Sequence, residues 1–305
     1  MFVGKIVLFL LFVSLSVISL TIISCDTTEP KLDTYHNKIL FTSNRNGKEQ
    51  LYMMNPDGTN IVQITNGKYS HSGGRWSPDA KQIVCNTEEK MSTAGISMAV
   101  MNSDGSNRRL LGYGNQMTWH PDGSKIIFSY WPGSEIGIYD IKLYSIEPNG
   151  NDRKVISEKY AGSHTFSPDG THIAFSVELD SVVRIAVLDY PQFENPHYIG
   201  PAGAILPNWS PNGNEITFSA REIPTEPGDI YIMNSDGSNQ RRITNNTSSM
   251  PYIDPRWSPG GDKIIFLAIT VDGTHKWYLY MVNIDGTDFH RVIDDSTVTS
   301  CDWSK

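Results

Sequence analysis

Five segments of this chain combine aromatic rings with charged and hydrogen-bonding groups and do not repeat elsewhere: "SNRNGKEQ", "TNGKYSHSGG", "YWPGSEIGIYD", "AREIPTEPGD" and "TNNTSSMPYIDP". Such a mixture can stack on sugar rings or anchor a protein partner. An ordinary loop whose aromatics cover the ends of strands is the alternative for each residue. The candidate ligand contacts are Tyr69, His71, Tyr130, Trp131, Glu135, His164, Arg221, Glu222, Tyr252 and Asp254.

Three of the eight histidines could support a second chemistry. His71, His164 and His275 lie in or beside variable segments, whereas the other five fall in the N-terminal tether, in repeated turns or in expected outer strands. Imidazoles that converge from separate segments can bind a divalent metal ion and assist catalysis. A polar loop residue is the simpler interpretation of each of the three. We therefore predict neither a metal nor another cofactor.

Motifs of common enzymes are missing from the sequence. It contains no Gly-x-Ser-x-Gly, no His-Glu-x-x-His and no Cys-x-x-Cys, which are the patterns of serine hydrolases, zinc peptidases and thiol or zinc sites. The repeated "NSDGSN" has some likeness to a calcium loop, but too few carboxylates gather at any one turn. The sequence therefore favours a binding protein over an enzyme.

A repeated phrase provides the elements that must position these residues. The five copies are "WSPDAKQIVC" from Trp76, "WHPDGSKIIF" from Trp119, "FSPDGTHIAF" from Phe166, "WSPNGNEITF" from Trp209 and "WSPGGDKIIF" from Trp257. An isoleucine follows each aromatic residue by seven positions, and successive aromatics lie 43 to 48 residues apart. A period in the forties is typical of a four-stranded propeller blade.

A second phrase alternates with the first, as in "MMNPDGTN" from Met53 and "IMNSDGSN" from Ile232; "LDYPQFENP" replaces it after Phe166. Pro presets φ in the first phrase and Gly accepts positive φ in both, so each phrase predicts a hairpin turn. The runs between them are continuously apolar, which indicates strands packed on both faces. We expect the repeated aromatics, together with Trp303, to be core residues rather than ligand contacts.

The two ends of the repeat region complement each other. "NKILFTS" from Asn37 has the features of a second strand without the aromatic phrase before it, and Ser296–Ser304 has those of a first strand with nothing after it. Joining them predicts an all-β, six-bladed β-propeller over residues 37–305, whose first blade is closed by the C-terminal strand at about 296–304. Closure removes an exposed sheet edge. The repeated turns would lie on one face and the variable connections on the other, where binding residues gather.

The N-terminal residues indicate export. Met1–Ser24 contains Lys5 and then an apolar run, and Ser24 stands directly before Cys25. This resembles a bacterial lipoprotein box, which implies that residues 1–24 are cleaved and that Cys25 carries the lipid. An uncleaved transmembrane anchor is the alternative. Residues 25–36 would then be a tether, and the protein would be lipid-anchored in the cell envelope, on the periplasmic side or the outer membrane.

Charge and cysteine content limit the possible partners. The net charge is −8, and no basic stripe is present, so a nucleic-acid partner is not expected. Membrane contact is expected through the N-terminal lipid only. Cys85 and Cys301 are the remaining cysteines; a disulfide is one interpretation, and two buried thiols is the one we favour.

These phrases resemble the repeats of TolB-type β-propellers, which are also described as WD40-like or PD40 repeats, from about Asn37 to Lys305. TolB proper has an α/β domain before its propeller, whereas only the tether precedes it here. The resemblance implies an exported scaffold that binds proteins or glycans. With the missing enzyme motifs and the variable segments, we expect a monomeric, non-enzymatic protein that binds an envelope protein or a glycan through the variable-loop face. Oligogalacturonate lyases are built on related repeats with histidine ligands to a metal near the axis, so a metal-assisted polysaccharide lyase is the alternative function.

Overall fold

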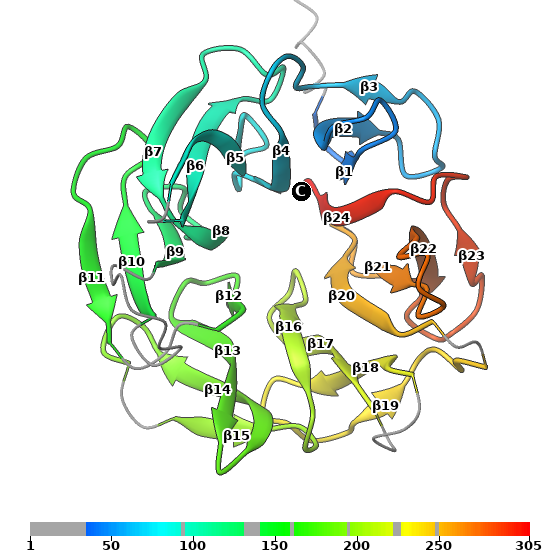
Figure 1. Ribbon diagram of the computed structural model, residues 1–305. Helices are drawn as coiled ribbons and strands as arrows, with labels where there is room; N and C mark the ends of the chain where they lie inside the picture. Colours follow the sequence, from blue (N-terminus) through cyan, green and yellow to red (C-terminus); the bar gives the residue numbers. More distant parts are fainter. Residues whose placement is uncertain are drawn as a thin grey trace, which may run out of the picture. The chain divides into compact units, whose positions relative to one another are not determined.

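The computed structural model describes residues 35–92, 95–130, 141–158, 162–193, 196–221, 227–247 and 250–305. They belong to one compact unit, Tyr35–Lys305. Its strands form six four-stranded antiparallel sheets arranged around a central axis (Figure 1). The predicted six-bladed all-β propeller is therefore confirmed. Within the described ranges, no helix is long and apolar enough to cross a membrane.

Each blade is named here with its strands in order from the axis outward. Blade 1 comprises β24 (Val298–Trp303), β1 (Ile39–Ser43), β2 (Gln50–Met54) and β3 (Val62–Gln63). Blade 2 comprises β4 (His71–Trp76), β5 (Gln82–Ser92), β6 (Gly95–Asn102) and β7 (Arg109–Tyr113). Blade 3 comprises β8 (Asn115–Trp119), β9 (Ile126–Tyr130), β10 (Lys142–Ile146) and β11 (Lys154–Ser157).

The other three blades follow the same plan. Blade 4 comprises β12 (His164–Phe166), β13 (His172–Leu179), β14 (Val182–Asp189) and β15 (His197–Ile199). Blade 5 comprises β16 (Ile205–Trp209), β17 (Glu215–Ala220), β18 (Asp229–Asn234) and β19 (Arg241–Arg242). Blade 6 comprises β20 (Tyr252–Trp257), β21 (Lys263–Ile269), β22 (Trp277–Asn283) and β23 (His290–Arg291).

Both repeated phrases form the hairpin turns that their composition predicts. In blade 4, the amide of Gly170 donates to the carbonyl of Ser167 at 2.9 Å. The hydroxyl of Ser167 donates to the Asp169 carboxylate at 2.5 Å. Blade 2 has Ala80 at the position of this glycine, with a left-handed φ of 54°. The turn geometry therefore persists even where a Cβ makes it less favourable.

The repeated Ile-Ile-Phe strand supplies the core of the blades. Its phenylalanines are fully buried in five blades, at Phe41, Phe128, Phe175, Phe218 and Phe266. Phe41 faces Tyr52 on the neighbouring strand, with stacked rings 5.5 Å apart. Buried side chains of one blade also pack against those of the next, so neighbouring blades cover each other's faces.

The C-terminal strand closes the ring as predicted. β24 pairs with β1 in antiparallel register, with Trp303 opposite Ile39. The indole nitrogen of Trp303 donates to Oδ1 of Asn37 at 2.9 Å. In Figure 1, β24 lies at the axis beside β1. The first blade is thus assembled from segments at opposite ends of the repeat region.

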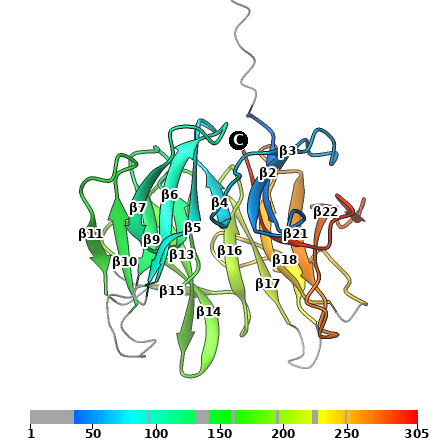
Figure 2. The same cartoon turned by 45° about the horizontal axis from the view of Figure 1, so that its top comes forward.

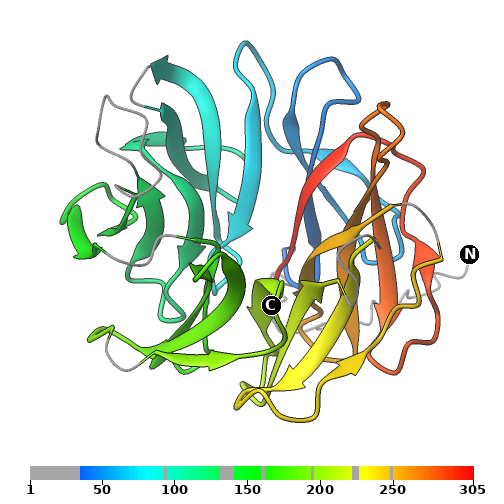
Figure 3. The ribbon, with the colours of Figure 1, turned by 60° about the horizontal axis from the view of Figure 1, so that its bottom comes forward.

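Antiparallel pairing places the connections on two faces of the ring. Figure 2 shows the C-terminus, which follows the last inner strand, at one end of the ring and the β13–β14 hairpin at the other. Figure 3 shows the inner strands running along the axis between these two faces. The Ser-Pro turns leave the inner strands at the C-terminal face, and the variable connections enter the inner strands at the opposite face.

Candidate functional site

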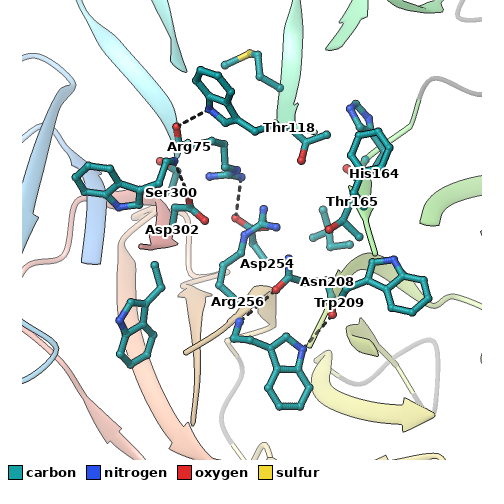
Figure 4. Close-up of a pocket in the computed structure, with 18 of the residues that line it drawn as sticks. Arg75, Thr118, His164, Thr165, Asn208, Trp209, Asp254, Arg256, Ser300 and Asp302 are labelled. Carbon is teal, nitrogen blue, oxygen red and sulfur yellow. Dashed lines mark hydrogen bonds and ion pairs between the residues drawn. The ribbon is translucent and has the colours of Figure 1, made fainter. Parts of the chain in front are cut away.

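The six inner strands surround an axial cavity of about 450 Å³. Its wall contains residues from all six blades and extends along the inner strands, in blade 3 from Asn115 to Pro121 of the turn that follows β8. Figure 4 shows side chains of this wall converging from several blades.

The residue immediately before the repeated aromatic lines the cavity in every blade. Successive side chains of a strand point to opposite sides, so when the aromatic enters a blade core the preceding residue faces away from it. We call these six residues the axial ring. They are Arg75, Thr118, Thr165, Asn208, Arg256 and Asp302.

Bulges in four inner strands bring a second residue to the cavity. Pairing shifts register within β4, β8, β16 and β20, just before the ring residue. The residue three positions before the aromatic has a left-handed φ: Gly73 at 64°, Gln116 at 52°, Leu206 at 56° and Asp254 at 53°. A bulge bends its strand and redirects a side chain. All four residues line the cavity.

Two ring residues also connect neighbouring blades. Oδ2 of Asp302 accepts a hydrogen bond from the backbone amide of Trp76 at 2.7 Å. Oδ1 of Asn208 accepts from the backbone amide of Trp257 at 3.2 Å. In both cases a side chain of the axial ring accepts a hydrogen bond from the backbone amide of the repeated aromatic in the following blade. These side chains therefore stabilise the contact between blades and also line the cavity.

Four charged residues form a cluster on one side of the cavity. Nη2 of Arg256 donates to Oδ1 of Asp254 at 2.7 Å, and Nη2 of Arg75 lies 3.7 Å from Oδ2 of the same carboxylate. Nη1 of Arg75 donates to the carbonyl oxygens of Gly74 and Cys301 at 3.0 and 3.1 Å. Asp254 thus bridges two guanidinium groups.

Burial shifts the protonation equilibria of this cluster. It raises the pKa of Asp302, against the opposing effect of the two arginines. Burial, followed by repulsion from Arg256, lowers the pKa of Arg75. Burial alone would also lower the pKa of Arg256, but Asp254 and then Asp302 raise it above its ordinary value. Burial therefore disfavours the charged forms of Asp302 and Arg75, whereas the two aspartates stabilise the charged form of Arg256.

The repeated aromatics are core residues, as predicted. Their exposed fractions lie between 5% for Trp257 and 9% for Trp209. The indole nitrogens of Trp119 and Trp257 donate to the backbone carbonyls of Arg75 and Asn208 in the preceding blades, at 3.2 and 3.1 Å. All six aromatic residues nevertheless form part of the cavity wall.

Of the ten candidate contacts, the structure brings His164 and Asp254 to the cavity. His164 is buried; Nδ1 lies 2.9 Å from the carbonyl of Gly162, and burial lowers its pKa. Asp254 belongs to the charged cluster. Trp131, Glu135 and Glu222 lie outside the described residues, as does the expected lipidation site Cys25.

The other five candidates lie apart from the cavity wall. Tyr252 is buried in an aromatic cluster, and Tyr130 packs beside a stacked arginine. His71 is buried, and neither ring nitrogen has a hydrogen-bond partner among the described residues. Tyr69 is half-buried and Arg221 is exposed. These five do not form one site.

The sequence interpretation missed all six residues of the axial ring because it searched only the non-repeating segments. Arg75, Thr118, Thr165, Asn208, Arg256 and Asp302 all stand one position before an aromatic of the repeat, and Asp254 was selected for its loop. The available signal was a fixed position in the repeat whose residue type varies from blade to blade.

The three histidines considered as possible metal ligands are dispersed. His164 lines the cavity, whereas His71 does not contribute to its wall and His275 is exposed. Across the described ranges, no group of three or more His, Cys, Asp or Glu residues is placed to hold a metal ion. Cys85 and Cys301 are buried free thiols, as favoured from the sequence.

Comparison with known sequences supports the repeat assignment. A family model described as the TolB beta propeller domain, PD40, matches residues 9–159. An uncharacterized protein of Agrobacterium fabrum is 25% identical over 248 residues, 75% of this chain and 79% of that protein. The Tol-Pal system protein TolB of Francisella tularensis is 25% identical over 229 residues, 57% of this chain and 49% of that protein. The chain thus spans about half the length of that TolB.

Solved structures share the propeller fold. TolB from Acinetobacter baumannii superposes with a TM-score of 0.71 at 16% identity, over 88% of this chain and 67% of that one. An oligogalacturonate lyase in complex with manganese gives a TM-score of 0.53 at 14% identity, over 80% and 85% of the two chains. Its repeats, its six closed blades and the family match over residues 9–159 show that this chain contains TolB-like β-propeller repeats.

Proposed function

We propose that this chain is a non-enzymatic binding scaffold of the bacterial cell envelope, anchored by a lipid at Cys25, which holds a segment of a partner in its axial cavity. The observation that carries the proposal is the axial ring. All six of its positions are polar or charged, although the aromatic that follows each one is a core residue.

The size of the cavity suits this role. About 450 Å³ falls within the usual range of ligand pockets, roughly 300–1,000 Å³. A closed ring also provides a rigid frame, since each blade is held by neighbours on both sides. A rigid site loses less conformational entropy when it binds than a flexible loop does.

The variable-loop face remains part of the proposal as the approach to the cavity. The wall includes Gly73, Asn115 and Thr299, near the ends of inner strands at which the variable connections enter. A partner that docks on these connections can place a segment on the axis. The loop residues selected from the sequence would then contact the partner outside the cavity.

The envelope location rests on the N-terminal sequence and on the named relative. Met1–Cys25 has the pattern of a lipoprotein signal, and a curated relative is a Tol-Pal system protein. Metabolic labelling with an alkyne fatty acid tests the anchor. We expect label on the native chain and none on Cys25→Ser; equal labelling of both would contradict lipidation at Cys25.

Site-specific photo-crosslinking in cells tests binding at the axis. A photoreactive phenylalanine analogue replaces Thr118 on the axial ring or, as a control, Tyr198, which is 40% exposed on β15. We expect a crosslinked partner from position 118 and not from position 198. Crosslinks of equal yield at both positions, or none at position 118, would contradict the proposal.

A polysaccharide lyase is the second candidate, favoured by the fold shared with an oligogalacturonate lyase. Incubation with oligogalacturonate and Mn²⁺ distinguishes the two functions through the ultraviolet absorbance of an unsaturated product. The binding proposal expects no product. Product that disappears on His164→Ala would favour the lyase.

A further inference from the structure

The charges of the axial ring lie on one side of the cavity. Arg256, Asp302 and Arg75 stand on β20, β24 and β4, the inner strands of consecutive blades (Figure 4). The other three blades contribute uncharged side chains at the same position, namely Thr118, Thr165 and Asn208.

The fold does not demand arginine at these positions. β8 and β16 have the same bulge as β4 and β20, yet they present Thr118 and Asn208. Withdrawing a guanidinium group from water is costly unless it is paired and hydrogen-bonded. The side chains of Arg75 and Arg256 are only 20% and 14% exposed. An arginine pair at this depth therefore indicates a purpose beyond assembling the blades.

The hydrogen bonds of the two arginines are incomplete. Of the five N–H groups of Arg75, those on Nη1 contact two carbonyl oxygens, while Nη2 lies 3.7 Å from Asp254. Arg256 uses Nη2 for Asp254, and its buried Nε has no partner among the described residues. A buried donor without a partner is uncommon in proteins and costs stability.

Two guanidinium groups share one carboxylate. Among the described residues, Asp254 is the acid that forms an ion pair with Arg75 or Arg256. The Asp302 carboxylate accepts from the amide of Trp76 and is within ion-pair distance of neither arginine. The cluster consequently has unused donors, and its two cations repel each other. A further carboxylate between the arginines would accept from these donors and reduce the repulsion.

We infer that Arg75 and Arg256 form a receptor for a carboxylate, and that the ligand is an acidic peptide segment whose Asp, Glu or C-terminal carboxylate binds between them. This inference rests on the proposed binding function of the cavity. The planar fork of arginine matches a carboxylate in a bidentate geometry, which a lysine cannot reproduce.

The wall favours a peptide over an acidic glycan. Sugar rings stack on exposed aromatic faces, but the six repeated aromatics of this wall are at least nine-tenths buried. Trp277 is the one partly exposed aromatic residue among those that line the cavity. Opposite the arginines, the hydroxyls of Thr118 and Thr165 and the amide of Asn208 offer both donors and acceptors. Such groups are complementary to the N–H and C=O groups of an extended peptide.

Selection of a random peptide library on the full chain tests the inference. We expect the selected peptides to contain an essential Asp or Glu. The affinity of one such peptide, measured by fluorescence anisotropy on the native protein, should fall roughly ten- to a hundredfold when that residue becomes Gln or Asn. This comparison changes only the peptide, so it does not depend on the folding of a protein variant.

Protein variants locate the receptor. Arg75→Gln and Arg256→Gln should each weaken the acidic peptide by a similar factor and should weaken its amide counterpart less, because an amide oxygen accepts only uncharged-acceptor hydrogen bonds from a guanidinium. Arg109→Gln, at an exposed arginine on the outer strand β7 and outside the cavity, is the matched control and should change neither affinity. Thermal unfolding of each variant establishes that it is folded.

Three other results of these binding experiments would contradict the peptide inference, the binding proposal or both. Neutral peptides that bind in the cavity, equally to native protein and arginine variants, would overturn the carboxylate receptor and leave the binding function intact. If fluorescent oligogalacturonate binds and both arginine variants abolish its binding, while no peptide is selected, the ligand is a glycan and the peptide inference is wrong. Binding of neither probe, with no crosslinked partner at position 118, would overturn both proposals.

Discussion

The backbone amide of Trp76 donates to the Asp302 carboxylate at 2.7 Å, so the inner strand of blade 2 is joined to the last strand of the chain. Arg75 adds a hydrogen bond to the carbonyl of Cys301 at 3.1 Å. The closing strand is therefore held by blade 2 as well as by β1 within its own blade. Side chains that line the cavity thus also hold the ring closed.

Replacing Asp302 tests this second attachment. Asp302→Ala leaves the buried amide of Trp76 without an acceptor, which should cost about 1–3 kcal/mol of unfolding free energy. Asp302→Asn should cost less, because Asn208 already accepts the equivalent amide of Trp257 through its side-chain oxygen. Urea unfolding measures both. Equal losses in the two variants would show that the hydrogen bond is not the stabilising feature.

Gly105, Gly286 and Gly273 have the same φ of 83°. Comparing substitutions at these positions separates the cost of backbone strain from the cost of contact between blades. A Cβ on Gly105 would lie 2.3 Å from the carbonyl oxygen of Ile64, and one on Gly286 would lie 3.0 Å from that of Ile243. A Cβ on Gly273 would meet nothing within 4 Å.

Alanine at each of these glycines should destabilise the fold in a defined order. Gly273→Ala should cost about 1–3 kcal/mol for its left-handed backbone. Gly286→Ala should cost more than Gly273→Ala. Gly105→Ala should cost the most, about 1–3 kcal/mol more than Gly273→Ala, because its Cβ would overlap the neighbouring blade. Chemical denaturation ranks the three variants. If Gly273→Ala proved the most harmful, close packing between blades would not be the dominant effect.

The turn carboxylate Asp169 should make stability sensitive to acid. A hydrogen bond from the Ser167 hydroxyl, followed by one from the Thr171 amide, lowers its pKa to about 2. A lowered carboxylate pKa contributes stability above the unfolded value near 3.9, and this contribution disappears as the pH falls toward about 2.

Asp169→Asn tests this contribution. Asn212 occupies the same turn position in blade 5 and accepts from the Ser210 hydroxyl at 2.8 Å, so the variant should fold normally at pH 7. It should then lose less stability than the native protein between about pH 4 and pH 2. Urea midpoints across that range provide the measurement, and parallel curves for the two proteins would contradict the assignment.

Cys85 and Cys301 should be unreactive in the folded protein. Burial raises the pKa of the Cys85 thiol to about 12 and also raises that of Cys301. The thiolate is the reactive form, so iodoacetamide at pH 8 should label neither residue until urea unfolds the chain. Peptide mapping assigns the label to each cysteine. Labelling of Cys301 under native conditions would mean that β24 detaches readily from the ring.

The repeat carries much of the fold in its local chemistry. Pro and Gly fix the two turns, the continuous apolar runs require strands covered on both faces, and a phrase divided between Asn37 and Trp303 requires closure by the C-terminal strand. Each of these features depends on neighbours in sequence or on a register repeated in every blade. They could therefore be predicted before the structure was known.

The candidate site depends on contacts that the local sequence does not encode. Arg75 and Asp254 stand 179 positions apart in the chain, and a bulge in β20 together with ring closure places their charged groups 3.7 Å apart. Tyr252, two positions before Asp254, instead points into a buried aromatic cluster. The sequence by itself determined the blades and how the ring closes, because their patterns are local and repeated; only the tertiary structure decided which side chains meet on the axis, because that depends on the curvature of the ring and on bulges within its inner strands.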